Sequence, residues 1–383
     1  MIYFDNAATT LIKPEQVRKL IIEGISSGKY GNPGRGSHKA ALNALEEIYK
    51  TREALAKLFN LGEPENIALT QNGSASLNFV INSLFAEPQN AHIITTVTEH
   101  NSVLRPLYAL EKKGLKLSFV GINEEGVLNY EMFENLIQAE TKAIITTHAS
   151  NVTGNKTDIE RVYKIAKKHG LIFIVDASQT AGSCPIDISA FENSIFCFTG
   201  HKGLLGPGGT GVICVNGDFK FSQVFSGGSG HDSFNKNHPN QMPDIFEVGT
   251  INVPSFMGLR GGVEFILEVG TKTIEAKLNK LKQAFLKGLT NIPKLKIAGD
   301  KTFEKTSAIV SLNLAELSSS ELSFVLDDSY EIATRPGAHC APRLHEALGT
   351  KEQGLVRFSF SYFNTIEEIN KALEVLETLA KKN

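Results

Sequence analysis

Few cysteines and no long apolar run occur in this sequence. The four cysteines among 383 residues are too few for a disulfide framework, and none has the Cys-x-x-Cys spacing of a zinc or iron–sulfur site, so no metal site is expected. Cys197 and Cys214 stand in apolar, strand-like contexts that favour buried packing. No stretch approaches the ~18 consecutive apolar residues of a membrane-spanning helix. The N-terminus lacks the basic and apolar regions of a signal peptide, so we expect a cytoplasmic protein without a membrane partner.

The sequence also lacks an excess of charge of either sign. The 39 Lys and Arg residues nearly balance the 41 Asp and Glu residues, and the formal net charge is -2. A nucleic-acid-binding protein usually carries a concentrated basic stripe, whereas the lysines of residues 277–287 are interspersed with apolar residues, as on the solvated face of a helix. We therefore expect no nucleic-acid partner. The chain is 42% hydrophobic and 21% charged, which is typical of a globular protein, and its length suggests about two domains.

Helical and strand patterns alternate from about residue 40 to residue 215. Short runs rich in β-branched residues predict strands, and segments with helical periodicity separate them. The strands are expected at 67–70, 93–97, 116–120, 143–147 and 171–175, and the helices at 42–61, 74–85, 101–113, 130–138 and 157–169. Near-continuous apolar strands between helices indicate a mostly parallel sheet with both faces covered, which is an α/β fold.

The pattern changes after about residue 255. A long helical segment over 256–289 is followed by strand candidates at 307–313 and 355–361 and by a closing helix at 365–381. This order predicts a smaller α+β domain. We expect a large domain over 15–255 and a small domain that combines 1–14 with 256–383.

Two charged residues follow buried strands, at the sheet edge where ligands bind in such folds. Asp176 ends the apolar run 171–175, where a desolvated carboxylate either caps a turn or pairs with a cationic partner such as a protonated pyridine nitrogen. Lys202 comes just after the strand Ser194–Thr199 and is poorly explained as a packing residue. Desolvation lowers the pKa of an amine, as the lysine of a Schiff base requires.

Polar clusters follow other strands as well. Asn72-Gly73-Ser74 opens a helix, where free backbone N–H groups and the helix dipole suit a phosphate monoester, although Asn72 or Ser74 could simply be an N-cap. His100 and Asn151 also follow expected strands. The glycines of 206–211 are not a phosphate loop, because Lys202 precedes them, and we expect a tight turn into a strand at 212–215.

Taken in order, these segments resemble the class V aminotransferase family, and within it the cysteine desulfurases and selenocysteine lyases. The resemblance covers nearly the whole chain, and the ordered set is far more specific than any single tetrapeptide. The matching segments are Tyr3-Phe-Asp-Asn-Ala-Ala-Thr9, Arg35-Gly-Ser-His38, Glu99-His100, Asn151-Val-Thr-Gly154, Asp176-Ala-Ser-Gln179, Thr199-Gly-His-Lys202, Glu247-Val-Gly-Thr250, Arg335-Pro-Gly-Ala-His-Cys340 and Phe358–Glu368.

The resemblance implies the fold-type I architecture and a pyridoxal 5'-phosphate cofactor. It implies that Lys202 forms the Schiff base, that Asp176 pairs with the pyridine nitrogen and that His100 stacks on the ring. Thr250 would reach the phosphate from a second subunit, which implies a homodimer with shared active sites. The remaining cofactor residues would be Asn151 and Gln179 near the phenolic oxygen, and Gly73, Ser74, Thr199 and His201 at the phosphate.

The resemblance also implies a substrate and a nucleophile. Arg357 would clamp the substrate carboxylate, with His38, Asn151 and Arg335 nearby. The thiolate of Cys340 would take the sulfur of L-cysteine as a persulfide and leave L-alanine. Cys340 lies between prolines and a glycine, which indicates a loop, and positive charge from Arg335 and His339 would favour the thiolate.

Two departures from the family pattern stand out. Gly73-Ser74-Ala75 replaces the common Thr-Thr-Glu or Ala-Thr-Glu, so the backbone donors remain but one hydroxyl contact is lost. Ala338 stands where the family often has His, which would alter the packing of the cysteine loop. The cysteine context is closer to the subgroup with a short, ordered loop, in which persulfide transfer commonly depends on an acceptor protein.

The alternatives differ in what they require of Cys340. A selenocysteine lyase would share every residue named above. A class V aminotransferase or racemase acting on another small amino acid would not need Cys340. A sulfur-carrier or regulatory protein could retain the fold without turnover, although an intact set of Lys202, Asp176, His100 and Arg357 weighs against it.

Overall fold

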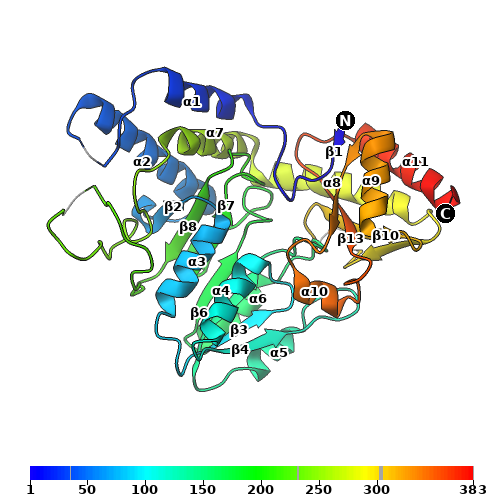
Figure 1. Cartoon of the computed structure of the whole chain (residues 1–383), viewed down its shortest axis with the longest axis horizontal. Helices are drawn as coiled ribbons and strands as arrows, with labels where there is room; N and C mark the ends of the chain where they lie inside the picture. Colours follow the sequence, from blue (N-terminus) through cyan, green and yellow to red (C-terminus); the bar gives the residue numbers. More distant parts are fainter. Residues whose placement is uncertain (35, 231–232, 302–304, 383) are drawn as a thin grey trace.

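A seven-stranded sheet forms the centre of the larger part of the molecule (Figure 1). The computed structural model describes residues 1–34, 36–230, 233–301 and 305–382. The strand order is β2-β8-β7-β6-β5-β3-β4, and β8 runs antiparallel to both of its neighbours while the rest are parallel to one another. The strands are β2 (Ile67–Thr70), β3 (His92–Thr96), β4 (Lys116–Val120), β5 (Thr141–Thr147), β6 (Ile172–Asp176), β7 (Ser194–Thr199) and β8 (Gly211–Asn216). The expectation of a mostly parallel sheet is confirmed.

Helices cover both faces of this sheet. Helices α3 (Gly73–Leu84) and α4 (Asn101–Glu111) pack on one face, with alternate strand residues such as Ile174. The other face packs under α2, α6 and α7 through residues such as Phe173 and Val175. The bounds are α2 (Lys39–Phe59), α5 (Tyr130–Asn135), α6 (Ile159–Lys168) and α7 (Val253–Val269), with short 3-10 helices at Pro64–Asn66 and Ile188–Ala190. Because successive strand residues point to opposite faces, a strand buried on both sides is apolar throughout.

The C-terminal part folds around a second, antiparallel sheet with the order β12-β13-β10-β9. Helices α8 and α11 lie against each other beside it, and Phe285 of α8 packs on Phe358 of β13 at a ring-centroid distance of 5.0 Å. The N-terminal strand β1 pairs with β11, so the start of the chain contacts this part. The bounds are β1 (Ile2–Tyr3), α1 (Glu15–Ser26), α8 (Thr271–Leu289), β9 (Leu295–Ala298), β10 (Ile309–Leu314), α9 (Ser319–Tyr330), β11 (Ile332–Ala333), β12 (Arg335–Gly337), α10 (Pro342–Ala347), β13 (Leu355–Ser359) and α11 (Ile366–Lys382).

The expected single helix over 256–289 is wrong. The segment forms two helices, α7 and α8, which meet at Gly270. Gly270 has a φ of 86°, a left-handed backbone that a continuing α-helix does not allow but glycine adopts readily. The apolar periodicity continues on both sides of Gly270, so the pattern does not reveal the break. The short elements β9, α9 and α10 and the helix α1 were not predicted either.

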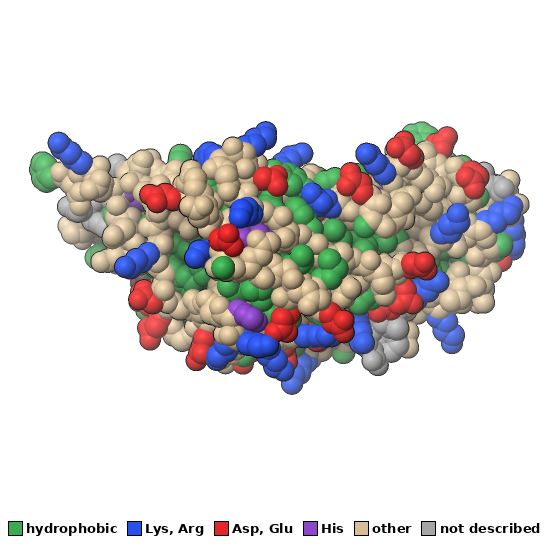
Figure 2. Space-filling view, turned by 90° about the horizontal axis from the view of Figure 1, so that it is seen from below, with side chains coloured by type: hydrophobic (Ala, Val, Ile, Leu, Met, Phe, Trp, Pro, Cys, Tyr) green, Lys and Arg blue, Asp and Glu red, His purple; other side chains and the backbone are tan. Residues whose placement is uncertain are grey.

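Acidic and basic side chains are interspersed on the face of the molecule that Figure 2 shows. That distribution agrees with the near balance of charges in the sequence. Across the described ranges, every helix is too short or too polar to cross a membrane.

A buried ion pair ties β2 to the segment before α7. Arg52 Nη2 lies 2.6 Å from Glu247 Oε2, and the backbone N–H of Leu69 donates to Glu247 Oε1 at 2.8 Å. Arg52 Nε also donates to the carbonyl of Ile67 at 3.1 Å. Burial raises the pKa of Glu247, and Arg52 opposes that rise. The pair therefore fixes the strand that leads into Gly73, at the cost of desolvating two charges.

Replacing Glu247 with alanine should lower the free energy of unfolding by about 3–5 kcal/mol, because Arg52 would stay buried without its partner. Urea unfolding followed by circular dichroism measures the loss. Glu192→Ala, which removes the partner of Lys167 from an exposed pair, is the matched control and should leave the midpoint nearly unchanged. Equal midpoints for the two variants would contradict a structural role of the buried pair.

Candidate active site

A cavity of about 230 Å³ lies at the carboxyl ends of the parallel strands. The turns after β2, β3, β5, β6 and β7 all contribute to its wall, because parallel strands end at a common edge of the sheet. The predicted site residues that line it are Gly73, Ser74, His100, Asn151, Asp176, Gln179, Thr199, His201, Lys202, Arg335 and Arg357. Three others, His38, Thr250 and Cys340, are not among its lining residues.

The backbone around Lys202 is held by the N-terminal segment. Thr10 Oγ1 donates to the carbonyl of Lys202 at 2.7 Å, and Lys13 Nζ donates to the carbonyl of His201 at 3.0 Å. Glycine is required at Gly200, between β7 and Lys202, because a Cβ there would overlap Thr210. Burial lowers the pKa of Lys202 to about 8, while the nearby Asp176 carboxylate opposes that shift. The expected effect of burial on this amine is confirmed.

Asp176 is the last residue of β6 and is 4% exposed. Its Oδ1 accepts a hydrogen bond from the backbone N–H of Ser178 at 2.9 Å. The turn that this bond closes agrees with the interpretation of Asp176 as a turn cap. The carboxylate also lines the cavity together with Lys202, so the turn-capping role does not remove it from the cavity.

His100 caps the start of α4, where its Nδ1 accepts from the N–H of Ser102 at 3.0 Å. Burial lowers the pKa of His100 to about 4, so the ring is neutral at pH 7. Ser102 was not predicted, yet it lines the cavity and its hydroxyl lies 2.6 Å from that of Ser74. The argument that singled out Ser74, a hydroxyl in the first turn of a helix that follows a strand, applies equally to Ser102. Ser102 lies in the first turn of α4, two residues after His100.

At the start of α3, an N-cap side chain and unpaired backbone N–H groups occur together. Asn72 Oδ1 accepts from the N–H of Ala75 at 2.9 Å, so Asn72 is the N-cap that the sequence left open. The N–H groups of Gly73 and Ser74 belong to the first helical turn, which has no acceptor within the helix. A Cβ on Gly73 would lie 3.2 Å from Ser178 Oγ, so a glycine here leaves the turn open to the cavity.

Two arginines also line the cavity. Arg335 and Arg357 are cross-strand neighbours on β12 and β13. Arg357 is fully buried, and its Nη1 donates to the carbonyl of Asn151 at 2.9 Å while its Nη2 donates to Asp5 Oδ1 at 2.8 Å. Within the described ranges, Asn151 Oδ1 and Arg357 Nε are buried polar atoms without a partner. Such atoms are expected where a ligand completes the hydrogen bonding.

Cys340 lies beside the cavity on an exposed turn between β12 and α10, and the expected loop is confirmed. Arg335 Nη2 is 3.9 Å from Cys340 Sγ, and the N–H of Asn101 donates to the Cys340 carbonyl at 2.7 Å. The expected charge on His339 is wrong: burial lowers its pKa to about 3, so the ring is neutral. Arg335 is the cation next to the thiol. The other cysteines, Cys184, Cys197 and Cys214, are buried, as expected for Cys197 and Cys214.

His38 and Thr250 are exposed and lie away from the cavity. His38 caps α2, where its Nδ1 accepts from Ala41 N–H at 3.3 Å. Thr250 Oγ1 accepts from Asn32 Nδ2 at 3.2 Å. Arg35, in the same motif as His38, falls outside the described residues.

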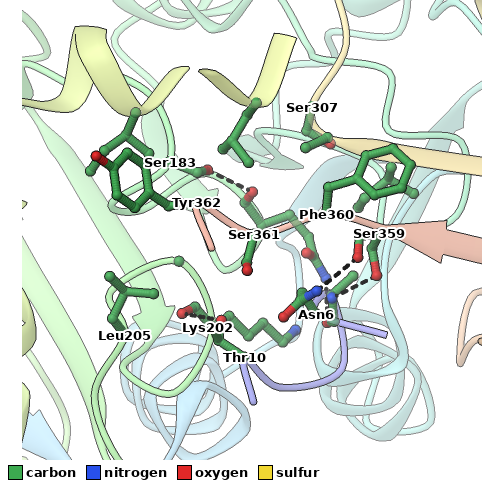
Figure 3. Close-up of a pocket in the computed structure, with 17 residues that line it drawn as sticks. Asn6, Thr10, Ser183, Lys202, Leu205, Ser307, Ser359, Phe360, Ser361 and Tyr362 are labelled. Carbon is green, nitrogen blue, oxygen red and sulfur yellow. Dashed lines mark hydrogen bonds between the residues drawn. The ribbon is translucent and has the colours of Figure 1, made fainter. Parts of the chain in front are cut away.

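A second cavity, of about 50 Å³, reaches Lys202 from the side of the N-terminal segment (Figure 3). Asn6 and Thr10 of that segment line it together with Ser183 of the large part and Tyr362 of the small part. Figure 3 shows the Asn6 amide bonded to Ser359, and its Nδ2 donates to the Ser359 carbonyl at 3.0 Å. Lys202 therefore lies where three parts of the chain meet.

Comparison with known proteins assigns the family. The sequence model of the class-V aminotransferase family matches residues 2–372. This chain belongs to the class-V aminotransferases. A probable cysteine desulfurase of Pyrococcus abyssi is 34% identical over 392 aligned residues, which cover 100% of this chain and 94% of that protein.

Solved structures agree with this assignment to the class-V aminotransferases. The apo cysteine desulfurase of Thermococcus onnurineus superimposes with a TM-score of 0.93 at 33% identity, covering 100% of this chain and 95% of that one. The cysteine desulfurase CsdA of Escherichia coli superimposes with a TM-score of 0.87 at 26% identity, covering 99% and 94%. The predicted fold-type I architecture is confirmed.

Class-V aminotransferases depend on pyridoxal phosphate, and the cavity fits that cofactor. It holds a lysine of lowered pKa, a buried carboxylate and a neutral imidazole, which are Lys202, Asp176 and His100. It also has a helix start of the kind that binds phosphate, at Gly73 and Ser74. The unpartnered Asn151 Oδ1 leaves an acceptor for the bound group.

Borohydride treatment of the cofactor-loaded protein should join the cofactor covalently to Lys202, and peptide mapping should find the label there. Lys13 is an informative competitor, because burial lowers its pKa to about 8 as well, although it does not line the cavity. Lys13→Arg should keep the label, and Lys202→Ala should lose it. A label on Lys13, or on any lysine other than Lys202, would refute the assignment.

Proposed function

We propose that this chain is a pyridoxal-phosphate-dependent cysteine desulfurase that converts L-cysteine to L-alanine and takes the sulfur as a persulfide on Cys340. One observation carries the proposal: the exposed thiol of Cys340 lies beside Arg335, and Arg335 lines the cavity that holds Lys202 and Asp176. The relatives named above, which are cysteine desulfurases, support it. An aminotransferase would have no use for a thiol at this position.

The cofactor residues divide by the part of the cavity that they line. Lys202 would hold the cofactor covalently, and its Nζ, once released, would take the proton from the substrate Cα. A pKa near 8 leaves part of the amine neutral at physiological pH, as a base must be. Asp176 would keep the pyridine nitrogen protonated, and the bound cofactor would then accept the electrons left on Cα.

The remaining contacts orient the cofactor and the substrate. His100 would stack on the ring, and Asn151 and Gln179 would lie near the phenolic oxygen. Arg357 would bind the substrate carboxylate, with Arg335, Asn151 and His38 nearby, since its N–H groups form a fork that suits two carboxylate oxygens. At the other end, the phosphate would be held by Gly73, Ser74, Thr199 and His201.

The sulfur step requires a thiolate at the cavity rim. Cys340 Sγ would attack the sulfur of the substrate, so that a sulfur–sulfur bond forms as the substrate Cβ–S bond breaks. The electron pair of the broken bond stays with the substrate Cβ, which is then protonated. Lys202 Nζ would return a proton to Cα, so that the product leaves as L-alanine. Arg335 Nη2 lies 3.9 Å from Sγ and so places a cation beside the attacking sulfur.

We further propose a homodimer with shared active sites. Exposed apolar side chains gather on α2 and on the segment before α7; they are Leu42, Leu45, Tyr49, Val224, Phe225 and Phe234. Exposed apolar side chains that cluster are typical of an interface. Thr250 and His38 are exposed on the same two segments, which suits residues that complete the partner's site.

Three expectations complete the proposal. The exposure of Cys340 suits delivery of the persulfide to an acceptor protein. A cytoplasmic location is proposed from the sequence. The division into a large domain over 15–255 and a small domain of 1–14 with 256–383 is also proposed. This division assigns most of α7 to the small domain, although the helix packs on α1 and α2 of the large domain. Helix α7 therefore belongs to the boundary between the two.

Incubation of the holoenzyme with L-cysteine and a reductant should release sulfide and alanine in equal amounts. Cys340→Ser should retain the cofactor spectrum, because Cys340 lies outside the cavity wall, yet release no sulfide from L-cysteine. Sulfide and alanine are measured together in one time course.

The matched control is Cys184→Ser, a buried cysteine away from the cavity, which should release both products like the wild type. Sulfide release by Cys340→Ser at the wild-type rate would contradict the persulfide mechanism. Turnover of selenocysteine but not of cysteine by the wild type would favour a selenocysteine lyase.

Thr250→Ala should raise the Kd for pyridoxal phosphate about tenfold or more without changing the dimer, because one hydrogen bond to a charged phosphate is lost. Sedimentation and cofactor titration measure the two properties. Thr290→Ala, at an exposed threonine that ends α8, should change neither. A stable wild-type monomer with full cofactor occupancy would rule out shared sites.

A further inference from the structure

Asp5, in the N-terminal motif Tyr3–Thr9, has no role in the function proposed above. Its Oδ1 accepts a hydrogen bond from Arg357 Nη2 at 2.8 Å, and the two groups form an ion pair. Arg357 lines the large cavity, whereas Asp5 is not among the lining residues. The carboxylate therefore contacts the guanidinium from outside the cavity.

Arg357 needs a negative partner for two reasons. It is fully buried, and an unpaired buried cation is costly. Its directly opposite neighbour across the β12–β13 ladder is Arg335, and like charges at such positions repel. Burial and Arg335 both lower the pKa of Arg357, while Asp5 raises it. Among the described residues, Asp5 is the only carboxylate within ion-pair distance of Arg357.

The backbone fixes Asp5 in place. The N–H of Ser359 donates to the carbonyl of Phe4 at 2.7 Å, and Asp5 itself forms a parallel bridge with Ser359. Phe4 is fully buried and packs against Phe358, the residue that follows Arg357 in β13. The carboxylate is thus carried on a segment that pairs with the strand of Arg357, so the two cannot move independently.

The guanidinium is held at two of its nitrogens. Nη1 donates to the Asn151 carbonyl and Nη2 to Asp5, and each of these nitrogens carries a second N–H. A guanidinium fixed in this way loses less entropy when it binds a carboxylate, because its rotamer is already set.

We propose that Asp5 is a positioning residue: it holds Arg357 in the orientation that binds the substrate carboxylate and supplies the counter-charge that lets Arg335 and Arg357 lie side by side. The inference rests on the proposed role of Arg357. Asp5 acts through Arg357 and does not touch the substrate. Its effect therefore falls on ligands that carry a carboxylate and spares those that do not.

The test compares two ligands on the holoenzyme, L-alanine and ethylamine, which differ by the carboxylate. Cofactor absorbance follows each titration. In Asp5→Ala the Kd for L-alanine should rise about tenfold or more, as expected for losing a charge-assisted hydrogen bond, while the Kd for ethylamine stays within about twofold. Asp5→Asn keeps an acceptor oxygen but loses the charge, so its rise for L-alanine should be intermediate. In turnover of L-cysteine, KM should rise and kcat should change little.

Two further variants separate this inference from the proposed function. Glu331→Ala removes an exposed partner of the N-terminal amine and should change neither Kd, which controls for loosening of the N-terminus. Arg357→Lys should weaken L-alanine selectively. If it does not, the proposed clamp is wrong. If it does while Asp5→Ala and Asp5→Asn leave L-alanine binding unchanged, or weaken both ligands equally, the inference about Asp5 is overturned.

Discussion

The carboxyl ends of parallel strands share one edge of the sheet, and the site depends on that constraint. Most residues of β2, β3, β5, β6 and β7 are buried, so the charged side chains that this sheet contributes to the site stand at the last residue of a strand or after it. The turns after β2, β3, β5, β6 and β7 therefore carry the chemistry, although they are far apart in the chain. In the described sheet, β8 is the strand that runs antiparallel to its neighbours. It pairs with β2 and β7, and its carboxyl end lies at the opposite edge of the sheet from the site.

The cavity brings together groups that suit an amino-acid substrate. Lys202 and Asp176 at the sheet edge, the start of α3 and the two arginines all line it. Histidines nearby are neutral because burial lowers their pKa values, to about 4 for His100 and His201. Burial lowers the pKa of Lys202 as well, to about 8, so part of this amine is neutral at physiological pH.

The N-terminal segment links the two parts of the molecule at the site. It pairs with strands of the small sheet through β1 and Asp5, and it holds the carbonyl groups of His201 and Lys202 through Thr10 and its neighbours. Residues distant in sequence also hold the turn that carries Cys340. The N–H of Asn101 donates to the Cys340 carbonyl, and Asn151 Nδ2 donates to the His339 carbonyl at 2.7 Å. His339 and Cys340 both have a positive φ, a conformation that such contacts must maintain.

The sequence by itself determined the sheet, the order of its strands and helices along the chain, and the residues that follow each strand. Apolar runs and periodicity are local patterns of the sequence, so Asp176 and Lys202 could be recognised from a few neighbours. The resemblance to the class V aminotransferases supplied the roles that are proposed for Arg357 and Cys340. Only the tertiary structure decided the break at Gly270, the neutral state of His339 and the place of Ser102. It also decided the pairing of Asp5 with Arg357, because contacts and desolvation depend on which distant segments meet, and no local pattern records that.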